Sequence, residues 1–431
     1  MKIYNNPSPD SWTQLTVRPQ LELEFLESSV RNIVNRVRKS GDHALRELTL
    51  QFDKADVKEL QVTNDEFDNA EKSLSSSLKD AIRKAAANIE KFHAAQRRET
   101  VRTETTAGVL CWRKSVAIQN VGIYIPGGSA PLFSTVLMLG IPAKLAGCSQ
   151  VVLCSPPNKE GKINDAILFA ARLVGVSSVY KVGGAQAIAA MAFGTQTIKK
   201  VFKIFGPGNQ YVTKAKQLVM EFGVATDMPA GPSEVLVYAD AQANPAFVAS
   251  DLLSQAEHGE DSQVILLVND AELVSPIQKA ITEQLKSLPR KVIAEKSLSN
   301  SRVIVLPDEN SAVAFINEYA PEHLIINTND AEAVSQKIVN AGSVFLGNYS
   351  PEAVGDYASG TNHTLPTNGF AKAYAGVALE SFTKYITYQT LTEEGIRNIG
   401  PVVEEMAEAE QLIGHKMAVR VRLDSLSSNT K

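Results

Sequence analysis

The sequence is poor in cysteine and in long apolar runs. Among 431 residues there are only three cysteines, Cys111, Cys148 and Cys154, without CxxC spacing, so neither a disulfide framework nor a cysteine-only zinc site is expected. The longest apolar stretches, such as LFSTVLMLGIPAKLAG, are interrupted by Gly, Pro and Lys and are too short to span a bilayer. The start, MKIYNNPSPDSW, lacks the apolar core of a signal peptide. We therefore expect a cytoplasmic protein without a membrane partner.

A strong charge of one sign is also missing. The formal net charge is −4 and the sequence pI is about 6.0, so there is no global basic field to hold nucleic acid, and no nucleic-acid partner is expected. Local phosphate sites stay open, because backbone N–H groups can form them without net charge. Aromatic residues make up only 6% of the chain, but 44% hydrophobic and 21% charged residues are ordinary for a globular protein. The length suggests about three domains.

The apolar pattern predicts alternating strands and helices. Residues 20–100 repeat apolar positions at helical spacing, whereas VGIYI, QVVLC, SVYKV and VFKIF are short Val- and Ile-rich runs separated by segments of helical length. A second alternating series contains EVLVYAD, QVILLV, RVIVL, LIINT and SVFLG. Such alternation indicates parallel sheets with helical crossovers. The predicted fold class is α/β, with two Rossmann-like parallel-sheet domains and smaller N-terminal and C-terminal helical segments.

The domain boundaries follow the changes in pattern. We expect an N-terminal arm at 1–20, a first α/β domain from 21–120 plus 235–375, and a second α/β domain at 121–234. Residues 376–431 are expected to form a C-terminal helical segment, which is strongly helical and acidic from about 392.

Three glycine-rich turns follow predicted strands of the second domain. They are IPGGSAP at 125–131, VGGAQA at 182–187 and FGPGNQ at 205–210. Ligands of parallel sheets gather at the carboxyl ends of strands, where the next helix offers free N–H groups. None of the three is a complete GxGxxG fingerprint, so each alone favours a tight turn over a phosphate site. Their occurrence in one sheet makes a nucleotide or a similar anion an open alternative.

Polar residues that could bind a cation are scattered along the chain. Gln255 and His258 lie three residues apart at the end of a predicted helix, Asp356 lies in a Gly- and Ser-rich segment expected to be a loop, and His415 follows Gly414, where a helix is expected to end. Each has a structural alternative: a capping or solvated histidine, a turn-forming aspartate, and a histidine placed against a helix dipole. Together they offer the donors of a four-ligand divalent site, but spacing cannot show that they converge.

The remaining histidines are few. His43 and His93 are expected on helix surfaces, and His363 has no distinctive setting. Glu322 and His323 stand between a helix-like run that stops at Pro321 and a strand-like run that begins at Leu324.

Several blocks in order resemble the histidinol dehydrogenase family. From about residue 20 to 422 they are VGIYIPGGSAPLFSTVLM, KVGGAQAIAAMAFGT, KIFGPGNQYVTKAK, DMPAGPSEVLV, DLLSQAEHG, YAPEHL, AGSVFLG, GDYASGTNHTLPT and EEGI. The resemblance implies oxidation of L-histidinol to L-histidine through L-histidinaldehyde with two NAD⁺, the last steps of histidine biosynthesis. It implies Glu322 and His323 as the acid–base pair, with His323 as base and Glu322 activating water.

The resemblance also implies ligands and partners. It assigns one zinc ion per subunit to Gln255, His258, Asp356 and His415, and NAD contacts to Tyr124, Gln186 and Asn209. Its substrate contacts fall on Ser233, Gln255, His258, His323, Asp356, Glu410 and His415. It further implies a homodimer with an exchanged C-terminal segment, in which Glu410 and His415 complete the neighbouring site. The alternatives are a zinc hydrolase on an α/β fold, and a non-catalytic α/β protein that binds a small anion at the glycine turns.

Overall fold

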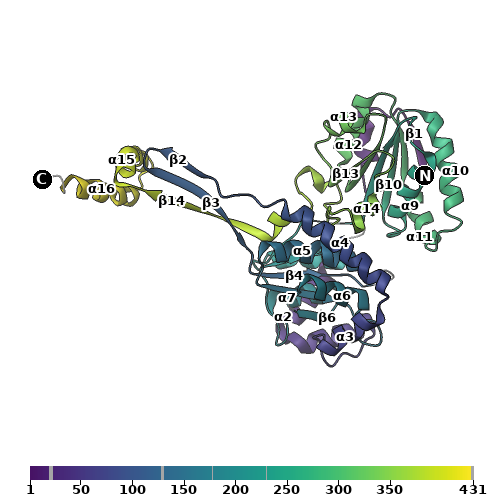
Figure 1. The fold of residues 1–431 in the computed structure, drawn as a ribbon, viewed down its shortest axis with the longest axis horizontal. Coiled ribbons are helices and arrows are strands. Elements are labelled where there is room, and N and C mark those ends of the chain that lie inside the picture. The colour runs from purple at the N-terminus through teal and green to yellow at the C-terminus, as the bar shows by residue number, and fades with distance from the viewer. Residues whose placement is uncertain (19–22, 128–130, 177, 230, 429–431) are drawn as a thin grey trace. The chain divides into compact units, whose positions relative to one another are not determined.

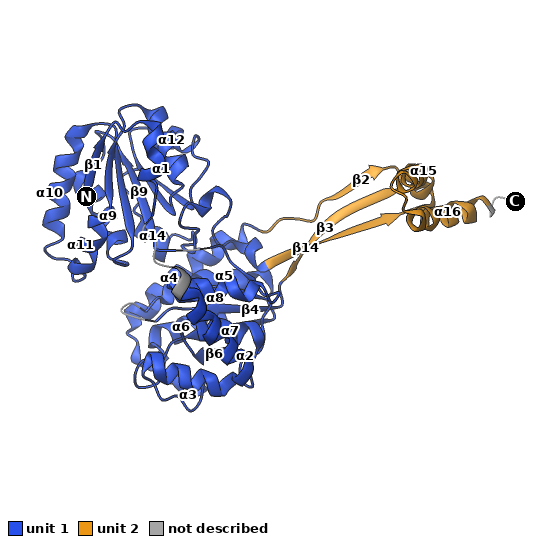
Figure 2. Ribbon diagram, turned by 180° about the vertical axis from the view of Figure 1, so that it is seen from behind, with its two compact units in different colours: residues 1–96, 118–382 blue, residues 97–117, 383–431 orange. Residues whose placement is uncertain are grey.

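A computed structural model describes residues 1–431 except 19–22, 128–130, 177, 230 and 429–431. The chain divides into two compact units, one of residues 1–96 and 118–382 and one of residues 97–117 and 383–431 (Figure 2). The first unit contains two parallel sheets with their helices. The second unit contains an antiparallel sheet and two helices.

The first parallel sheet has the strand order β1-β11-β10-β9-β12-β13 (Figure 1). Its strands are β1 (Lys2–Asn5), β9 (Glu234–Ala239), β10 (Gln263–Val268), β11 (Arg302–Val305), β12 (His323–Asn327) and β13 (Ser343–Leu346). Strands β9, β10 and β12 are buried along their whole length, which explains their continuous apolar sequence.

Helices cover both faces of this sheet. Side chains alternate between faces along each strand, so Val235 and Val237 pack on one side and Leu236 and Tyr238 on the other. The first face is covered by α9 (Pro245–Ala256), α10 (Val274–Gln284) and α11 (Lys291–Ser299). The second is covered by α1 (Trp12–Leu15), α12 (Glu309–Tyr319) and α13 (Ala331–Ser335).

The second parallel sheet has the order β6-β5-β4-β7-β8. Its strands are β4 (Asn120–Tyr124), β5 (Gln150–Ser155), β6 (Ser178–Lys181), β7 (Lys203–Phe205) and β8 (Ala225–Thr226). The helices between them are α5 (Phe133–Ala146), α6 (Asp165–Val174), α7 (Gly184–Phe193) and α8 (Gln210–Met220). The chain runs outward from β4 to β6 and then returns to the other side of β4, which creates a switch point between β4 and β7. Two parallel sheets in an α/β fold confirm the predicted fold class.

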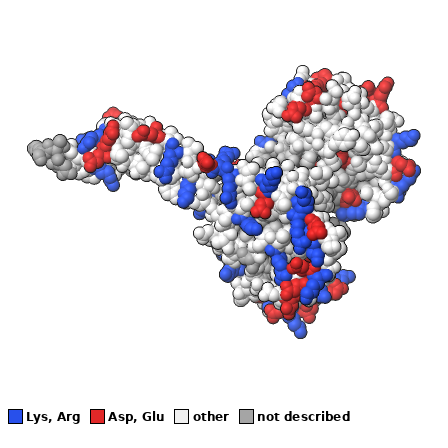
Figure 3. Space-filling view, in the orientation of Figure 1, with Lys and Arg blue, Asp and Glu red and all other residues white. Residues whose placement is uncertain are grey.

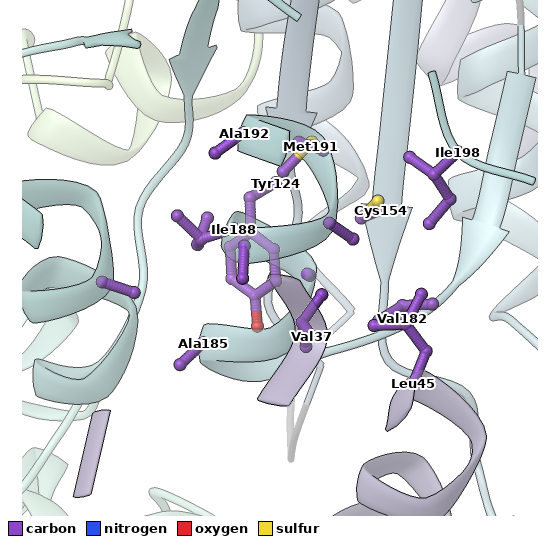
Figure 4. Packing of buried hydrophobic residues seen from close by; sticks show 14 of the residues in the cluster. Val37, Leu45, Tyr124, Cys154, Val182, Ala185, Ile188, Met191, Ala192 and Ile198 are labelled. Carbon is purple, nitrogen blue, oxygen red and sulfur yellow. The ribbon is translucent and has the colours of Figure 1, made fainter. Parts of the chain in front are cut away.

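Three N-terminal helices pack on the second sheet. They are α2 (Leu23–Asp53), α3 (Asn64–Ser73) and α4 (Ser76–Ala94). Val37 and Leu45 of α2 lie against Val182 and Ala185 (Figure 4), and Ile82 and Ile89 of α4 share the core on the other face. The sequence assigned residues 21–120 to the first domain. The domain boundaries stay a prediction, but these helices bury their apolar faces on the second parallel sheet. Amphipathic spacing predicts that a helix has a buried face but does not specify which sheet that face packs on.

The second unit was not anticipated as a sheet. Its strands β2 (Arg102–Thr106), β3 (Val109–Ala117) and β14 (Thr383–Leu391) form an antiparallel sheet in the order β14-β3-β2, with Tyr388 opposite Trp112. Two helices follow, α15 (Glu393–Ala409) and α16 (Ile413–Ser428). The helical character expected from about 392 is confirmed, whereas 383–391 within the expected helical segment is a strand.

Two histidines on N-terminal helices have different environments. The His43 side chain is largely exposed, as expected. His93 was expected on a helix surface, and this is wrong: it is fully buried, with Nδ1 3.2 Å from Gln96 Oε1 and Nε2 3.4 Å from Asn362 Nδ2. The burial comes from the segment that contains Asn362, and the sequence around His93 carries no sign that this distant segment packs against it.

The surface carries charges of both signs. Figure 3 shows basic and acidic groups interspersed over the face in view. Of the helices that the described residues form, none has the length and apolar character needed to cross a membrane.

Candidate active site

A cluster of possible cation ligands lies beside the first sheet. His258 follows the end of α9, and Glu352 and Asp356 come from α14 (Glu352–Tyr357). One ligand atom of each residue lies within 4.8 Å of the others. Glu352 and Asp356 are four residues apart on one short helix, so both carboxylates project from the same face. The cluster brings together His258 and Asp356, two of the four ligands that the family resemblance implies.

Polar atoms around this cluster lack partners within the described chain. Gln255 is 1% exposed, and its Oε1 and Nε2 are buried without a hydrogen bond. Asp356 Oδ1, Glu352 Oε2 and His323 Nε2 are in the same condition. Buried polar atoms are normally satisfied, so such a concentration indicates a place for water, an ion or a ligand. An amide oxygen, an imidazole and carboxylates are suitable donors for a divalent cation, and the residues therefore fit a metal ion.

The charges of the cluster are strongly coupled. Burial opposes ionisation of Asp356, but the nearby His323, His363 and His258 lower the pKa of its carboxyl. Burial raises the pKa of Glu352, an effect that His323 opposes. Burial lowers the pKa of the His258 imidazole, and the charge of Asp356 opposes this shift. Part of the residue nevertheless reaches solvent. A neutral imidazole beside an ionised carboxylate is the protonation state that metal binding requires.

His323 is held in one tautomer at the first position of β12. Its Nδ1 lies 3.1 Å from the backbone oxygen of Glu234. A carbonyl oxygen can only accept, so a neutral His323 must carry its proton on Nδ1 and keep the lone pair on Nε2. Nε2 lies 3.5 Å from Asp356 Oδ1, and the residue is 4% exposed. The free nitrogen therefore faces the ligand cluster.

Glu322 lies beside this histidine and is also buried. Its Oε2 accepts a hydrogen bond of 2.9 Å from the backbone N–H of Glu234 and lies 3.6 Å from His323 Nδ1. Burial raises the pKa of Glu322 to about 8, while the charge of His323 opposes that rise. Ser233, a predicted substrate contact, immediately precedes Glu234 and accepts from Gln263 N at 3.2 Å through its backbone oxygen.

Two local expectations about ligand residues are wrong. Asp356 was expected in a loop, but it lies in α14, because the segment after Pro351 forms a short helix of 6 residues. His415 was expected where a helix ends, but α16 begins at Ile413, so His415 lies in its first turn. Gly414 therefore lies inside the helix rather than after it.

Glu410 and His415 belong to the second unit. Glu410 is the C-cap residue that follows α15, and both residues are exposed. Of the predicted set, the described residues of the first unit bring His258 and Asp356 together and place His323 and Glu322 beside them. Gln255 is buried on α9, three residues before His258.

Two residues near the cluster were missed by sequence reasoning. Glu352 was not recognised because its spacing from Asp356 has meaning only on a helix. His363 connects α14 with α5. Its Nδ1 lies 2.8 Å from the backbone oxygen of Asp356 in α14, and its Nε2 lies 2.9 Å from Thr135 Oγ1 in α5. The motif TNHT carries no local signal for such a bridge.

The predicted cofactor residues line one cavity beside the second sheet. Tyr124, Gln186 and Asn209 all border a cavity of 1030 Å³. The Tyr124 hydroxyl accepts from Gly184 N at 3.0 Å, and Asn209 caps α8 by accepting from Tyr211 N and Val212 N. Figure 4 shows the Tyr124 ring among Ala185, Ile188 and Val37. Part of the first glycine turn, residues 128–130, lies outside the described residues.

The wall of the cavity includes one carboxyl group with a raised pKa. Asp53, at the end of α2, borders the cavity, and its Oδ2 is buried without a partner in the described chain. Burial raises the pKa of Asp53 to about 6.

The fold and these two sites define a class of protein. A buried glutamate–histidine pair beside possible cation ligands, in a unit that also contains a large cavity at a switch point, is the architecture of an α/β enzyme.

Comparisons with known proteins give the family. A sequence model of histidinol dehydrogenase matches residues 16–423. The chain is 58% identical over 426 residues to a histidinol dehydrogenase of Bacteroides fragilis, covering 99% of this chain and 100% of that protein. It is 51% identical to one from Escherichia coli, covering 98% and 97%. A crystal structure of histidinol dehydrogenase from Elizabethkingia anophelis matches with a TM-score of 0.97 at 56% identity and covers 99% of both chains. The chain belongs to the histidinol dehydrogenase family of oxidoreductases.

Proposed function

We propose that this chain oxidises L-histidinol to L-histidine through L-histidinaldehyde, in the cytoplasm, and reduces two NAD⁺. Family membership supports the reaction. The observation that carries the mechanism is the fixed tautomer of His323, whose free Nε2 faces the buried ligand cluster. The three cysteines are free thiols, which suits a reducing compartment.

Gln255, His258, Asp356 and, from a partner subunit, His415 would hold a zinc ion. The unpartnered atoms of Gln255 and Asp356 support this set. The bound ion would supply a fixed positive centre that orients the imidazole and amino nitrogens of the substrate. Glu352 is a further possible donor, because one of its carboxylate oxygens lies within 4.8 Å of the ligand atoms of His258 and Asp356. Its carboxylate also raises the pKa of His323. Ser233 and Glu410 would contact the substrate.

His323 would remove protons in both oxidations. In the first, Nε2 would accept the hydroxyl proton of histidinol while the carbon that bears this hydroxyl gives up a hydride to NAD⁺, and the aldehyde forms. Nδ1–H stays bonded to Glu234 O and keeps the imidazole in place throughout. Histidinol and one NAD⁺ thus become histidinaldehyde, NADH and one proton.

Glu322 would prepare the second oxidation. Its ionised carboxylate would accept a proton from water as that water adds to the aldehyde carbon, while the imidazolium of His323 would return its proton to the carbonyl oxygen, so that a gem-diol forms. The neutral His323 would then take a hydroxyl proton as the second hydride leaves for NAD⁺, and the resulting carboxylic acid loses its remaining proton to give the carboxylate. Adjacent placement of the two residues lets both steps occur without release of the reactive aldehyde.

The cavity bordered by Tyr124, Gln186 and Asn209 would bind NAD⁺. Its position at the switch point and the N-termini of α7 and α8 at its wall suit a dinucleotide.

We further infer a homodimer in which the C-terminal segment is exchanged. The helices α15 and α16 expose Val402, Met406, Ile413, Met417 and Val421, an apolar surface typical of a protein contact. His415, a residue that the ligand set needs, is exposed in the same segment.

The direct test mixes the protein with histidinol and NAD⁺ and follows NADH absorbance near 340 nm, with and without a chelator. We expect two NADH per histidinol, and loss of that signal after metal removal with recovery on adding zinc. No NADH, together with metal-dependent hydrolysis, would support the zinc hydrolase alternative instead.

A further inference from the structure

One residue, Glu234, contacts both candidate catalytic side chains through its backbone. Its N–H donates to Glu322 Oε2 at 2.9 Å, and its carbonyl oxygen lies 3.1 Å from His323 Nδ1. Glu234 begins β9 and His323 begins the neighbouring strand β12, where His323 pairs with Val235. The positions of the two catalytic groups therefore depend on where the first peptide of β9 lies.

The side chain of Glu234 is anchored by a buried ion pair. Arg18 donates to it with both sides of its guanidinium, from Nε to Oε1 at 3.3 Å and from Nη2 to Oε2 at 2.8 Å. The side chains are 11% and 1% exposed. The backbone N–H of Asn368 also donates to Oε1. The carboxylate is thus held from two segments distant in sequence.

Arg18 is fixed in turn by the helix that leads to the catalytic pair. Its Nη2 donates to the backbone oxygen of Tyr319 at 2.5 Å, and its guanidinium lies 3.7 Å from the centre of the Tyr319 ring. The Tyr319 hydroxyl donates to Gln263 Oε1 at 2.9 Å. Tyr319 ends α12, three residues before Glu322. Arg18 therefore joins both backbone segments that carry the site.

Stability alone is a poor explanation for this arrangement. Taking two charges out of water costs several kcal/mol, and apolar replacements of buried ion pairs are often as stable. A bidentate guanidinium does define direction and distance, which a hydrophobic contact does not. Catalytic groups need such definition, because a displacement of about 1 Å can cost about 10²-fold in rate.

We propose that the Arg18–Glu234 ion pair positions Glu322 and His323 by fixing the first peptide of β9 against the end of α12. This inference rests on the catalytic roles proposed above. Arg18 and Glu234 are positioning residues: their side chains act through the Glu234 backbone.

The test compares Arg18→Gln, Arg18→Lys and Glu234→Gln with the parent enzyme, with rates normalised to bound zinc. We expect kcat for histidinol to fall about 10- to 100-fold in Arg18→Gln and Glu234→Gln, with the KM for NAD⁺ within about twofold. Arg18→Lys keeps the charge without the fork, so its loss should be intermediate.

A matched control loosens the same N-terminal arm without touching Glu234. Arg302 Nη1 donates to the backbone oxygens of Leu15 at 2.8 Å and Val17 at 3.0 Å. Arg302→Gln should lower Tm but leave kcat within about twofold. Equal kcat losses in Arg302→Gln and Arg18→Gln would overturn the proposal, since arm attachment would then explain both.

A double variant separates positioning from stability. Each single change leaves a buried charge unpaired, whereas Arg18→Met/Glu234→Gln removes both charges and should recover Tm. We expect kcat to stay low in this double variant. Recovery of kcat along with Tm would show a purely structural pair and would overturn the proposal.

His323→Asn distinguishes the inference from the function beneath it. It should lower kcat by at least about 10²-fold with zinc content unchanged. If it does so while the Arg18 and Glu234 variants keep full kcat, only the ion-pair proposal fails. If His323→Asn itself keeps full kcat, the proposed catalytic assignment fails.

Discussion

At the scale of single residues, the active site concentrates carboxyl groups around one imidazole. Burial opposes the charge of His323, but Glu352, Glu322 and Asp356 together raise its pKa well above the ordinary value. A cation among these carboxylates would offset their charge and lower the pKa of His323, which favours the neutral form that a base requires. The ligand cluster and the base are therefore one electrostatic system rather than two sites.

The environment of Glu322 predicts a pH dependence for the second oxidation. Its pKa is raised to about 8 by burial, so the carboxyl is mostly protonated at neutral pH and gains its basic form as pH rises. With histidinaldehyde as substrate, kcat should climb with pH, pass through half of its maximum at about pH 8 and then level off. NADH formation between about pH 6 and 10 measures this profile.

Glu322→Gln is the matched control for that profile, because it keeps shape and the acceptor oxygen for Glu234 N–H. The variant should lose the rising limb and turn over slowly at every pH. An unchanged limb in Glu322→Gln would assign the titration to another group.

The sequence predicted some of these residues well and others poorly, for a physical reason. Gln255 and His258 could be paired because helix α9 ends where its apolar period stops. Glu352 could not be identified, since the relation between it and Asp356 appears only when the segment is helical. The blocks that resemble the family supplied roles that spacing left open.

At the scale of elements, buried strands were predictable and exposed ones were not. Strands β9, β10 and β12 are buried along their whole length and were predicted from their continuous apolar runs. Strand β14 pairs with β3, which is more than 260 residues earlier, and most of its residues are exposed. Pairing over that separation leaves no local pattern, so the antiparallel sheet was missed.

The close approach of β4 and β7 depends on one glycine. Gly206 has φ +129°, and a Cβ there would lie 2.1 Å from the backbone oxygen of Tyr124. Gly206→Ala must move the strand ends that border the cavity proposed for NAD⁺. We expect a loss of at least about 2 kcal/mol in the free energy of unfolding and a raised KM for NAD⁺.

Gly223→Ala separates this clash from backbone strain. Gly223 also has a positive φ, +79°, but a Cβ there would meet nothing within 4 Å. It should lose only about 1 kcal/mol, with KM unchanged. Denaturant unfolding and NAD⁺ titration provide the comparison, and equal effects of the two substitutions would show that β4–β7 contact is unimportant.

At the scale of the whole molecule, the proposed ligand set is divided between two compact units. Gln255, His258 and Asp356 belong to the first and His415 to the second. No linear pattern reveals that exposed His415 would complete a site on another subunit. The resemblance to a family supplied that idea, and only an experiment on the assembly can test it.

Hybrid dimers test the exchange directly. If His415 completes the partner's site, a dimer of one His258→Asn chain and one His415→Asn chain has one intact site and one doubly damaged site. Isolated with two affinity tags, it should show about half of the parent activity, although each variant homodimer is inactive. The reciprocal hybrid pairs a parent chain with a chain carrying both substitutions. Exchange damages both of its sites, so it should be inactive. If instead each chain completed its own site, the first hybrid would be inactive and the reciprocal one half active.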